Sequence, residues 1–336
     1  MKAWRIENND GIDALALVDL PSPQPARGQV KVRIMASSIN ARDFNTVRAP
    51  GARNTPLPRI PNSDGAGEVV AVGEGVTHFR PGDRIASCFF ARWPAGDVTE
   101  DVMASALGGP LDGVLAEEAV LEEAGVVHIP DHLSYAEAAT LPCAAVTAWN
   151  ALVERGGLRA GHTVLLMGTG GVSVFGLQIA TMFGARAIVT SKSDAKLERA
   201  RRMGAWETIN YAATPDWHTA VREITGGRGV DHVVEVGGPG TLQKSIEAAC
   251  MGGNIGMIGV LTQGEINPLP MMRKSLRLNG IYVGSREMFE RMNAAISANA
   301  LRPVIDRTFS FAEAREAYKY MAGAEHFGKI VIELGG

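Results

Sequence analysis

An apolar run that leads into a glycine cluster constrains the fold of this chain more than any other feature. Residues 163–167 read Thr-Val-Leu-Leu-Met, and Gly168-Thr169-Gly170-Gly171-Val172-Ser173 follows them. Such a run predicts a buried strand, a sharp glycine turn and then a helix. The uncharged stretch 163–185 covers 23 residues and could in length cross a bilayer. Five glycines lie within it, so strand, turn and helix are the better interpretation.

A glycine turn between a strand and a helix is suited to holding a phosphate. Bare backbone amides at a helix N-terminus attract an anion, and glycine lets the backbone approach a pyrophosphate. Ser173 stands where the usual motif has its third glycine, and it is small enough for helix packing and able to donate to a phosphate. A glycine-rich turn in an α/β domain without a ligand is the alternative interpretation.

The first and second parts of the chain carry different patterns. Up to residue 125, short runs such as 30–35 and 67–72 are separated by Pro/Gly turns, which predicts a small barrel or sandwich. From residue 126, strands alternate with amphipathic helices, which predicts βαβ units and a doubly wound parallel sheet. The expected strands are 163–167, 187–190, 232–236, 254–258 and 280–283, and the expected helices include 194–203 and 242–250. The tail adds a helix at 286–298, another from 311, and a strand at 329–334.

Composition excludes several classes of function. The net charge of −3 and the absence of a basic block argue against nucleic acid or a membrane surface as a partner. The three cysteines are far apart and the N-terminus lacks an apolar secretory signal, so we expect a reduced, cytoplasmic protein. Glycine is in excess, with 39 of 336 residues, which is nearly twice the usual ~7%.

The end of the second expected strand predicts which dinucleotide is bound. A site selective for NAD carries Asp or Glu about 20 residues after the first glycine, on the ribose 2′-hydroxyl. Here Thr190, Ser191 and Lys192 occupy that region, and Asp194 comes one helical position too late. Hydroxyls and a lysine suit a 2′-phosphate, so NADPH is favoured over NADH. A solvated lysine at a loop tip is the alternative for Lys192.

Taken together, the motifs resemble the medium-chain dehydrogenase/reductases, specifically their zinc-independent quinone oxidoreductase-like branch. The resemblance spans nearly the whole chain and rests on segments 38–43, 62–70, 79–84, 145–149, the glycine loop through Gln178, and 328–331. It implies an α/β fold with a GroES-like β-barrel catalytic domain at 1–125, a Rossmann domain at 126–284, and a C-terminal segment at 285–336 that completes the catalytic domain.

The resemblance also implies which residues bind the cofactor. Asn40 and Thr147 would lie beside the nicotinamide and its ribose, and backbone of Ile258, Gly259, Val260, Val283, Gly284 and Ser285 would contact the carboxamide. The pyrophosphate would be held by Gly168, Gly170, Gly171, Val172 and Ser173, the 2′-phosphate by Ser191, Lys192 and Tyr211, and Lys329 would join the cofactor site. Plainer roles stay open: a turn amide for Asn40, a helix-interior residue for Thr147, a packing ring for Tyr211 and an exposed lysine for Lys329.

Relatives that use zinc carry Cys where this chain has Asn40, and Gly-His-Glu where it has Ser63-Asp64-Gly65. Catalytic zinc needs three protein ligands. The sequence places an amide and a hydroxyl at the first two positions, none of the cysteines at a matching position, and seven scattered histidines. We therefore expect no zinc.

Without a metal, a simple ketone lacks an acid to polarise it. A quinone or an α,β-unsaturated carbonyl needs less help, because delocalisation spreads the charge that hydride brings. The candidate catalytic residues are Asn40, Arg42, Asp43 and Asn45, although Arg42 and Asp43 could equally form a structural ion pair. The proton donor and the particular substrate are not indicated.

Alternatives are a zinc-free alcohol dehydrogenase or carbonyl reductase, and a redox-silent NADPH-binding protein. The short apolar strand expected at 280–283 predicts a homodimer, since relatives pair this strand across a two-fold axis.

Overall fold

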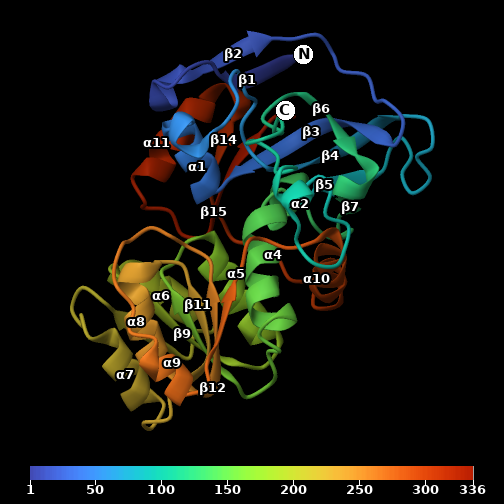
Figure 1. Ribbon diagram of the computed structural model, residues 1–336. Coiled ribbons are helices and arrows are strands. Elements are labelled where there is room, and N and C mark those ends of the chain that lie inside the picture. Colours follow the sequence, from blue (N-terminus) through green and yellow to red (C-terminus); the bar gives the residue numbers. More distant parts are fainter. Residues whose placement is uncertain (336) are drawn as a thin grey trace. The chain divides into compact units, whose positions relative to one another are not determined.

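The computed structural model describes residues 1–335, which form two compact units. Unit 1 comprises residues 1–146 and 284–335, and unit 2 comprises Thr147–Val283 (Figure 1). The expected α/β class with a doubly wound parallel sheet is confirmed. The division falls at 146/147 instead of the expected 125/126, because Val126–His128 (β7) pairs with a strand of unit 1, β5 (Arg84–Ser87). The C-terminal tail from Gly284 onward belongs to unit 1.

Unit 2 is built on a six-stranded sheet in which every neighbouring pair is parallel. From β8 the chain steps outward through β9 and β10, and then returns to the other side of β8 with β11, β12 and β13. The switch point therefore lies between β8 and β11, where ligands of such sheets bind at the carboxyl ends of the strands. The strands are β8 (Thr163–Met167), β9 (Arg186–Ser191), β10 (Glu207–Asn210), β11 (Val230–Glu235), β12 (Ala249–Met257) and β13 (Arg277–Gly280).

The helices of unit 2 connect these strands. They are α4 (Val146–Trp149), which begins at the last residue of unit 1, η5 (Asn150–Glu154), α5 (Gly171–Met182), α6 (Asp194–Arg202), α7 (Trp217–Ile224), α8 (Pro239–Ala248) and α9 (Leu269–Arg273). All five residues of β8 are buried, as are Ile188, Val233 and Ile255 on the neighbouring strands. The uncharged run 163–185 is thus accounted for by β8 and α5. No helix within residues 1–335 is long and apolar enough to cross a membrane.

The prediction of a strand at 280–283 is wrong. The edge strand is Arg277–Gly280, and it ends where the expected strand begins. Val283 has a φ of 58°, a left-handed conformation that lies outside the β region of a regular strand. By contrast, the strand at 163–167 and the helix at 286–298 have the predicted bounds.

Unit 1 is built on a seven-stranded sheet with path β14-β15-β3-β4-β5-β7, in which β6 also pairs with β3, and on a two-stranded sheet of β1 and β2. Apart from β5 and β7, its strands are β1 (Lys2–Ile6), β2 (Leu15–Asp19), β3 (Gln29–Ile39), β4 (Asp64–Val72), β6 (Glu118–Glu122), β14 (Ile305–Ser310) and β15 (Lys329–Glu333). Its helices are η1 (Gly11–Ala14), α1 (Ala41–Arg48), η2 (Gly51–Arg53), α2 (Glu100–Met103), η3 (Glu123–Gly125), α3 (Tyr135–Ala138), η4 (Leu141–Ala145), α10 (Arg286–Ala298), η6 (Phe311–Glu313) and α11 (Ala314–Ala322).

The long strand β3 brings the two ends of the chain together in unit 1. It pairs antiparallel with β4 on one side and with β15 from the C-terminal tail on the other. Ile39 at the end of β3 packs in one core cluster with Trp4 from the N-terminal strand and Tyr318 and Ile330 from the tail. This pairing places Lys329, the first residue of β15, beside the residues that start α1.

Candidate functional site

The glycine loop of unit 2 lies at the carboxyl end of β8, at the switch point of the sheet. Gly168 has a φ of 76°, and Gly170 is the N-cap of α5, with no side-chain cap on the helix. A Cβ added at Gly168 or Gly170 would meet nothing within 4 Å. The first-turn amides of a helix have no intrahelical acceptor, so this loop has the open space and the donors that a pyrophosphate requires.

Ser173 has a different part in this loop from the one the sequence suggested for its hydroxyl. The side chain is 2% exposed, and its Oγ donates to the backbone oxygen of Met167 at 2.6 Å. The hydroxyl therefore ties the helix to the preceding strand. The backbone of Gly171, Val172 and Ser173 forms the first turn of α5, so the donors left for a phosphate are the amides.

The three residues expected around a 2′-phosphate lie at the carboxyl ends of two adjacent strands: Ser191 ends β9, Lys192 follows it, and Tyr211 follows β10. Ser191 pairs in register with Asn210, and the amide of Tyr211 donates to the oxygen of Ser191 at 3.1 Å. Lys192 is exposed, and so is the Tyr211 ring at 39%. Asp194, the nearest following carboxylate, accepts from the side chain of Asn210 at 2.8 Å.

Backbone hydrogen bonds and close contacts fix the conformation of the 258–259 segment, which is expected at the carboxamide. The amides of Ile258 and Gly259 both donate to the oxygen of Glu235, at 2.9 and 3.2 Å. A Cβ at Gly259 would lie 1.7 Å from the oxygen of Val236, so only glycine fits there. Val260 beyond it is 77% exposed.

The other expected cofactor residues lie near the division of the chain. In unit 2, Thr147 is buried, and the oxygen of Val283 accepts from the Asn150 side chain at 2.7 Å. In unit 1, a Cβ at Gly284 would crowd Val146 and Met288, and Ser285 caps α10 by accepting from the Met288 amide.

A buried polar cluster stands at the start of α1 in unit 1. Asn40 is the N-cap of this helix, and Asp43 closes a capping box with it. The Asp43 carboxylate is 0% exposed and accepts from the Asn40 amide at 2.9 Å, from Asn40 Nδ2 at 3.1 Å, from Arg42 at 3.2 Å and from the Ser63 amide at 3.3 Å. Four donors on one carboxylate satisfy it fully.

Arg42 is held by several neighbours, whereas Asn45 is only half-buried. The Arg42 guanidinium pairs with Asp43, donates to the oxygen of Leu107 and lies 4.4 Å from the centre of the Phe89 ring. These contacts favour the structural ion pair that the sequence left as an alternative for Arg42 and Asp43. Both remain proposals as catalytic residues.

Asp64, Lys329 and Cys143 complete the cluster. Asp64 Oδ2 accepts from the Cys143 amide at 3.1 Å and lies 4.0 Å from Lys329 Nζ. Lys329 is 3% exposed and donates to the oxygen of Ile39 at 2.8 Å and to Asn40 Oδ1. Burial raises the pKa of the Asp64 carboxyl, and the nearby Lys329 ammonium opposes this shift.

The sequence did not indicate that Cys143 belongs here. Burial and the Asp64 carboxylate raise the pKa of its thiol. It lies in η4, a π-helical turn, and such turns are frequent at functional sites. The signal available in the sequence was its place four residues before Thr147, just ahead of segment 145–149, which carries part of the family resemblance.

The residues in this cluster do not form a zinc site. Asn40 contributes an amide whose oxygen is bound to an ammonium, and Ser63 contributes a hydroxyl that donates to Asp64 at 2.6 Å. A buried cation among the donors opposes a second cation. Within residues 1–335, no three His, Cys, Asp or Glu side chains gather in a way that could hold a metal.

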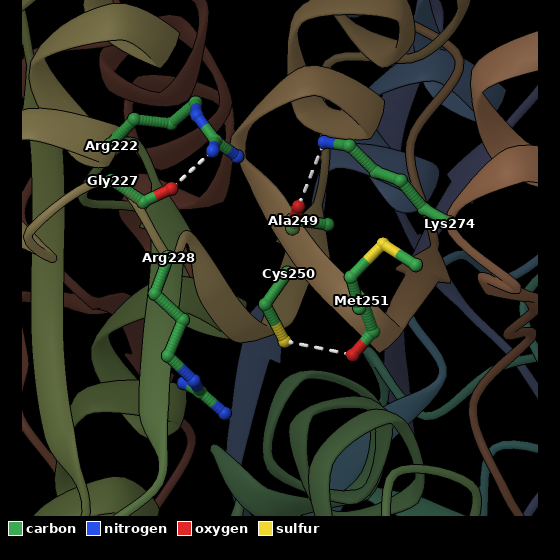
Figure 2. A pocket seen from close by; sticks show the side chains of 7 residues that line it. All are labelled: Arg222, Gly227, Arg228, Ala249, Cys250, Met251 and Lys274. Carbon is green, nitrogen blue, oxygen red and sulfur yellow. Dashed lines mark hydrogen bonds between the residues drawn. The ribbon is translucent and has the colours of Figure 1, made fainter.

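A separate pocket of unit 2 lies at the amino ends of β11 and β12, at the edge of the sheet opposite the glycine loop (Figure 2). Its cations have structural partners: Lys274 Nζ donates to the oxygens of Ile246, Glu247 and Ala249 at 3.0, 2.8 and 2.9 Å, which caps α8. The lining residues are Arg222, Gly227, Arg228, Ala249, Cys250, Met251 and Lys274.

The doubly wound sheet with its glycine loop, together with a second, β-rich unit, is typical of dinucleotide-binding oxidoreductases. Residues 26–131 match the alcohol dehydrogenase GroES-like domain, and residues 171–298 match the zinc-binding dehydrogenase domain. The chain belongs to the medium-chain dehydrogenase/reductase superfamily, as the sequence motifs predicted.

Similar proteins include both alcohol dehydrogenase-like and enone-reducing members. A zinc-type alcohol dehydrogenase-like protein of Schizosaccharomyces pombe is 42% identical over 96% of both chains. A 2-methylene-furan-3-one reductase of Solanum lycopersicum is 32% identical over 99% of this chain and 79% of its own. A crystal structure of an NAD-dependent alcohol dehydrogenase is 33% identical over all of both chains, with a TM-score of 0.90.

Proposed function

We propose that this oxidoreductase is zinc-independent and uses NADPH to reduce a quinone or an α,β-unsaturated carbonyl compound. The observation that carries the proposal is the cluster of Asn40, Asp64 and Lys329, in which a buried ammonium lies against the Asn40 amide and the Asp64 carboxylate. The family resemblance implies that zinc-using relatives carry Cys at the position of Asn40 and Gly-His-Glu at 63–65. The similarity to a 2-methylene-furan-3-one reductase supports an enone as acceptor.

The chemistry that bound NADPH supplies is a hydride, which adds to the acceptor and leaves negative charge on the acceptor's oxygen until a proton from water completes the reduction. The chain's part is to hold the acceptor and to stabilise that charge. In an enone the charge develops on the carbonyl oxygen, away from the carbon that receives hydride. A hydrogen-bond donor fixed in place is suited to that oxygen, and the half-buried Asn45 side-chain amide of α1 is the candidate for this donor.

The test is consumption of NADPH by the purified protein with a panel of quinones, enones, aldehydes and ketones, run with and without a metal chelator. We expect turnover with enones or quinones that the chelator leaves unchanged. Loss of turnover with chelator, restored by zinc, would contradict the proposal.

The second candidate is a zinc-free alcohol dehydrogenase, which the similarity to an NAD-dependent alcohol dehydrogenase over the whole chain favours. Oxidation of simple alcohols by NAD or NADP, with no turnover of enones or quinones, would replace the first proposal by this one.

The preference for NADPH is proposed from the end of β9. Ser191, Lys192 and Tyr211 follow one another at the ends of β9 and β10, and the next carboxylate along the chain, Asp194, is bound to Asn210. We expect Lys192→Asp to raise the Kd for NADPH about tenfold or more and to spare NADH, because it replaces a cation beside the phosphate by an anion. Arg27→Asp makes the same change of charge on an exposed residue of unit 1 and should alter neither Kd. If the ratio of the Kd values for NADPH and NADH is unchanged in Lys192→Asp, Lys192 does not bind the 2′-phosphate.

A homodimer is proposed through the free edge of unit 2. Among the described strands, β12 is the one partner of β13; Leu278 within β13 is 37% exposed, and Met272, a few residues before β13 in the chain, is 68% exposed. Exposed apolar side chains beside an open strand edge suit a second copy of the chain. Light scattering at micromolar concentration should give twice the monomer mass, and Met272→Lys should lower it, whereas Val98→Lys in unit 1 should not. A monomer mass for the unaltered chain would exclude the dimer.

A further inference from the structure

Glu235, the last residue of β11, carries a fully buried carboxylate. Its Oε1 accepts from the Gly237 amide at 2.7 Å, from the Gly238 amide at 3.0 Å and from Thr241 Oγ1 at 2.7 Å. Its Oε2 is hydrogen-bonded to Ser245 Oγ. Burial of a carboxylate is costly unless donors satisfy it. All of these donors belong to the segment that follows β11, so the side chain holds the start of that segment in one conformation.

The same residue also binds the loop that follows β12. The backbone oxygen of Glu235 accepts from the amides of Ile258 and Gly259, at 2.9 and 3.2 Å. Gly238 has a φ of 98°, and a Cβ there would lie 3.0 Å from the oxygen of Gly259. The loops after β11 and β12 are therefore in direct contact, and Glu235 is bonded to one through its side chain and to the other through its backbone.

A threonine at the surface joins the two loops a second time. Thr262 Oγ1 donates to the oxygen of Gly237 at 2.9 Å and accepts from the amide of Gly240 at 3.0 Å. The threonine is exposed, so this link depends on its hydroxyl and not on packing. Residues 236–241 and 258–262 are thus one connected element, which we call the switch-point frame.

The switch-point frame lies next to the glycine loop. In the pairing of β11 with β8, Val234 is opposite Leu166, so Glu235 and Met167 follow on neighbouring strands. Ser245 Oγ, a partner of Glu235, lies 3.5 Å from Met167 Sδ. A sheet of this topology has one mononucleotide-binding half on each side of its switch point. Because the adenosine half of the cofactor is assigned to the ends of β9 and β10, the frame belongs to the half that receives the nicotinamide nucleotide.

We propose that Glu235 is a positioning residue for the nicotinamide half of the cofactor: it holds the switch-point frame in the conformation that receives this half. The inference rests on the proposed function, which assigns the backbone of 258–260 to the carboxamide. Glu235 is buried and acts through that backbone. A loop that keeps its binding conformation for only a tenth of the time binds about tenfold more weakly, so a fixed frame strengthens binding without any contact between Glu235 and the ligand.

The test measures the two halves of the cofactor separately by titration calorimetry. The ligands are NADPH and adenosine 2′,5′-bisphosphate, which has the adenosine half and lacks the nicotinamide nucleotide. Glu235→Ala leaves the frame donors without their acceptor, and we expect the Kd for NADPH to rise about tenfold or more. The Kd for the bisphosphate should stay within about twofold. A merely structural role would weaken the binding of both ligands alike.

The conservative variant Glu235→Gln should restore binding. Its side-chain oxygen can still accept from the Gly237 and Gly238 amides, and its NH₂ group can donate to Ser245 Oγ. We expect it to recover at least about threefold of the tenfold loss in affinity for NADPH.

Two controls separate positioning from folding. Asn254 of β12 is 1% exposed and hydrogen-bonded through both ends of its amide, so Asn254→Ala should lower stability and leave both Kd values unchanged. If Glu235→Ala does not fold, Thr262→Val cuts the second link from the surface and should raise the Kd for NADPH alone about threefold. Thr181→Val makes the same exchange at an exposed position in the last turn of α5 and should change neither Kd.

Equal rises of the two Kd values in Glu235→Ala, or an unchanged Kd for NADPH in both Glu235→Ala and Thr262→Val, would overturn the inference. Failure of the proposed function is seen separately, because binding is measured without turnover. A protein that reduces no acceptor of the panel but shows the expected difference between the two ligands lacks the proposed reaction and retains the positioning residue. If the chain prefers NADH, the ligands become NADH and ADP, and the same difference is expected.

Discussion

The two units differ in whether their key polar groups have hydrogen-bond partners within the protein. In unit 1, Asp43 is fully buried and satisfied by four donors from its own unit. In unit 2, the amides at the start of α5 have no side-chain cap, and Nδ1 of the buried His232 has no hydrogen-bond partner within the described residues. A saturated cluster is rigid before any ligand arrives, whereas open donors gain their partners from a ligand. The comparison therefore predicts that unit 1 orients the acceptor and that unit 2 binds the cofactor.

The largest effect is expected where the saturated cluster is broken. Asp43→Ala would leave the Asn40 amides, the Ser63 amide and the Arg42 guanidinium without their common acceptor. Removing one partner of a buried charged pair costs about 3–5 kcal/mol, and we expect the free energy of unfolding to fall by about that amount in urea denaturation. Asp19→Ala removes an exposed carboxylate at the end of β2 and should change it by less than about 0.5 kcal/mol. A loss below about 1 kcal/mol in Asp43→Ala would show that the cluster is not the rigid element described.

Sequence patterns predicted the parts of the molecule that depend on local structure. The glycine loop, β8 and α10 are continuous segments whose apolar pattern and caps lie within a few residues, so their bounds could be predicted. The strand expected at 280–283 could not be corrected from sequence, because valine is a good strand residue and its φ of 58° is imposed by surrounding structure.

The unit 1 cluster could be predicted only in part. Asn40 and Asp43 share one capping box and were indicated together, but Asp64, Cys143 and Lys329 come from segments far apart in the chain. Burial of an ammonium is decided by the pairing of β15 with β3, and the sequence around Lys329 is also typical of an exposed lysine before a strand. Long-range pairing thus determines what local patterns leave open.

An effect of intermediate size on the free energy of unfolding is expected at His232, and this effect depends on pH. Burial, together with the neighbouring His162, lowers the pKa of His232 from 6.5 to about 4, and His162 Nδ1 lies 2.9 Å from His232 Nε2. Between about pH 4 and pH 6.5, His232 binds a proton in the unfolded chain but stays neutral in the folded chain. The folded state therefore loses stability as the pH falls from about 6.5 to about 4. The loss amounts to at most about 3 kcal/mol.

Urea denaturation at pH 7.5, 6 and 5 checks this prediction. His232→Asn should flatten the dependence on pH over this range. His78→Asn should keep it, since that side chain is 71% exposed. Equal slopes for the unaltered protein and His232→Asn would mean that the histidine pair is not the source of the acid sensitivity.

The smallest effect on stability, and the sharpest on function, is expected at the open loop. Gly170 has a φ of −77°, which alanine adopts readily, and a Cβ there meets nothing within 4 Å. Gly170→Ala should therefore leave the free energy of unfolding unchanged or raise it by about 0.5 kcal/mol. The added methyl group occupies the space that a pyrophosphate needs, so the Kd for NADPH should rise about tenfold or more. Gly280→Ala, at an equally open glycine of β13, should leave that Kd unchanged, because its methyl group lies away from the loop. If both variants bind NADPH like the unaltered protein, the open space at the glycine loop is not the phosphate site. The prediction that unit 2 binds the cofactor through this loop would then be wrong.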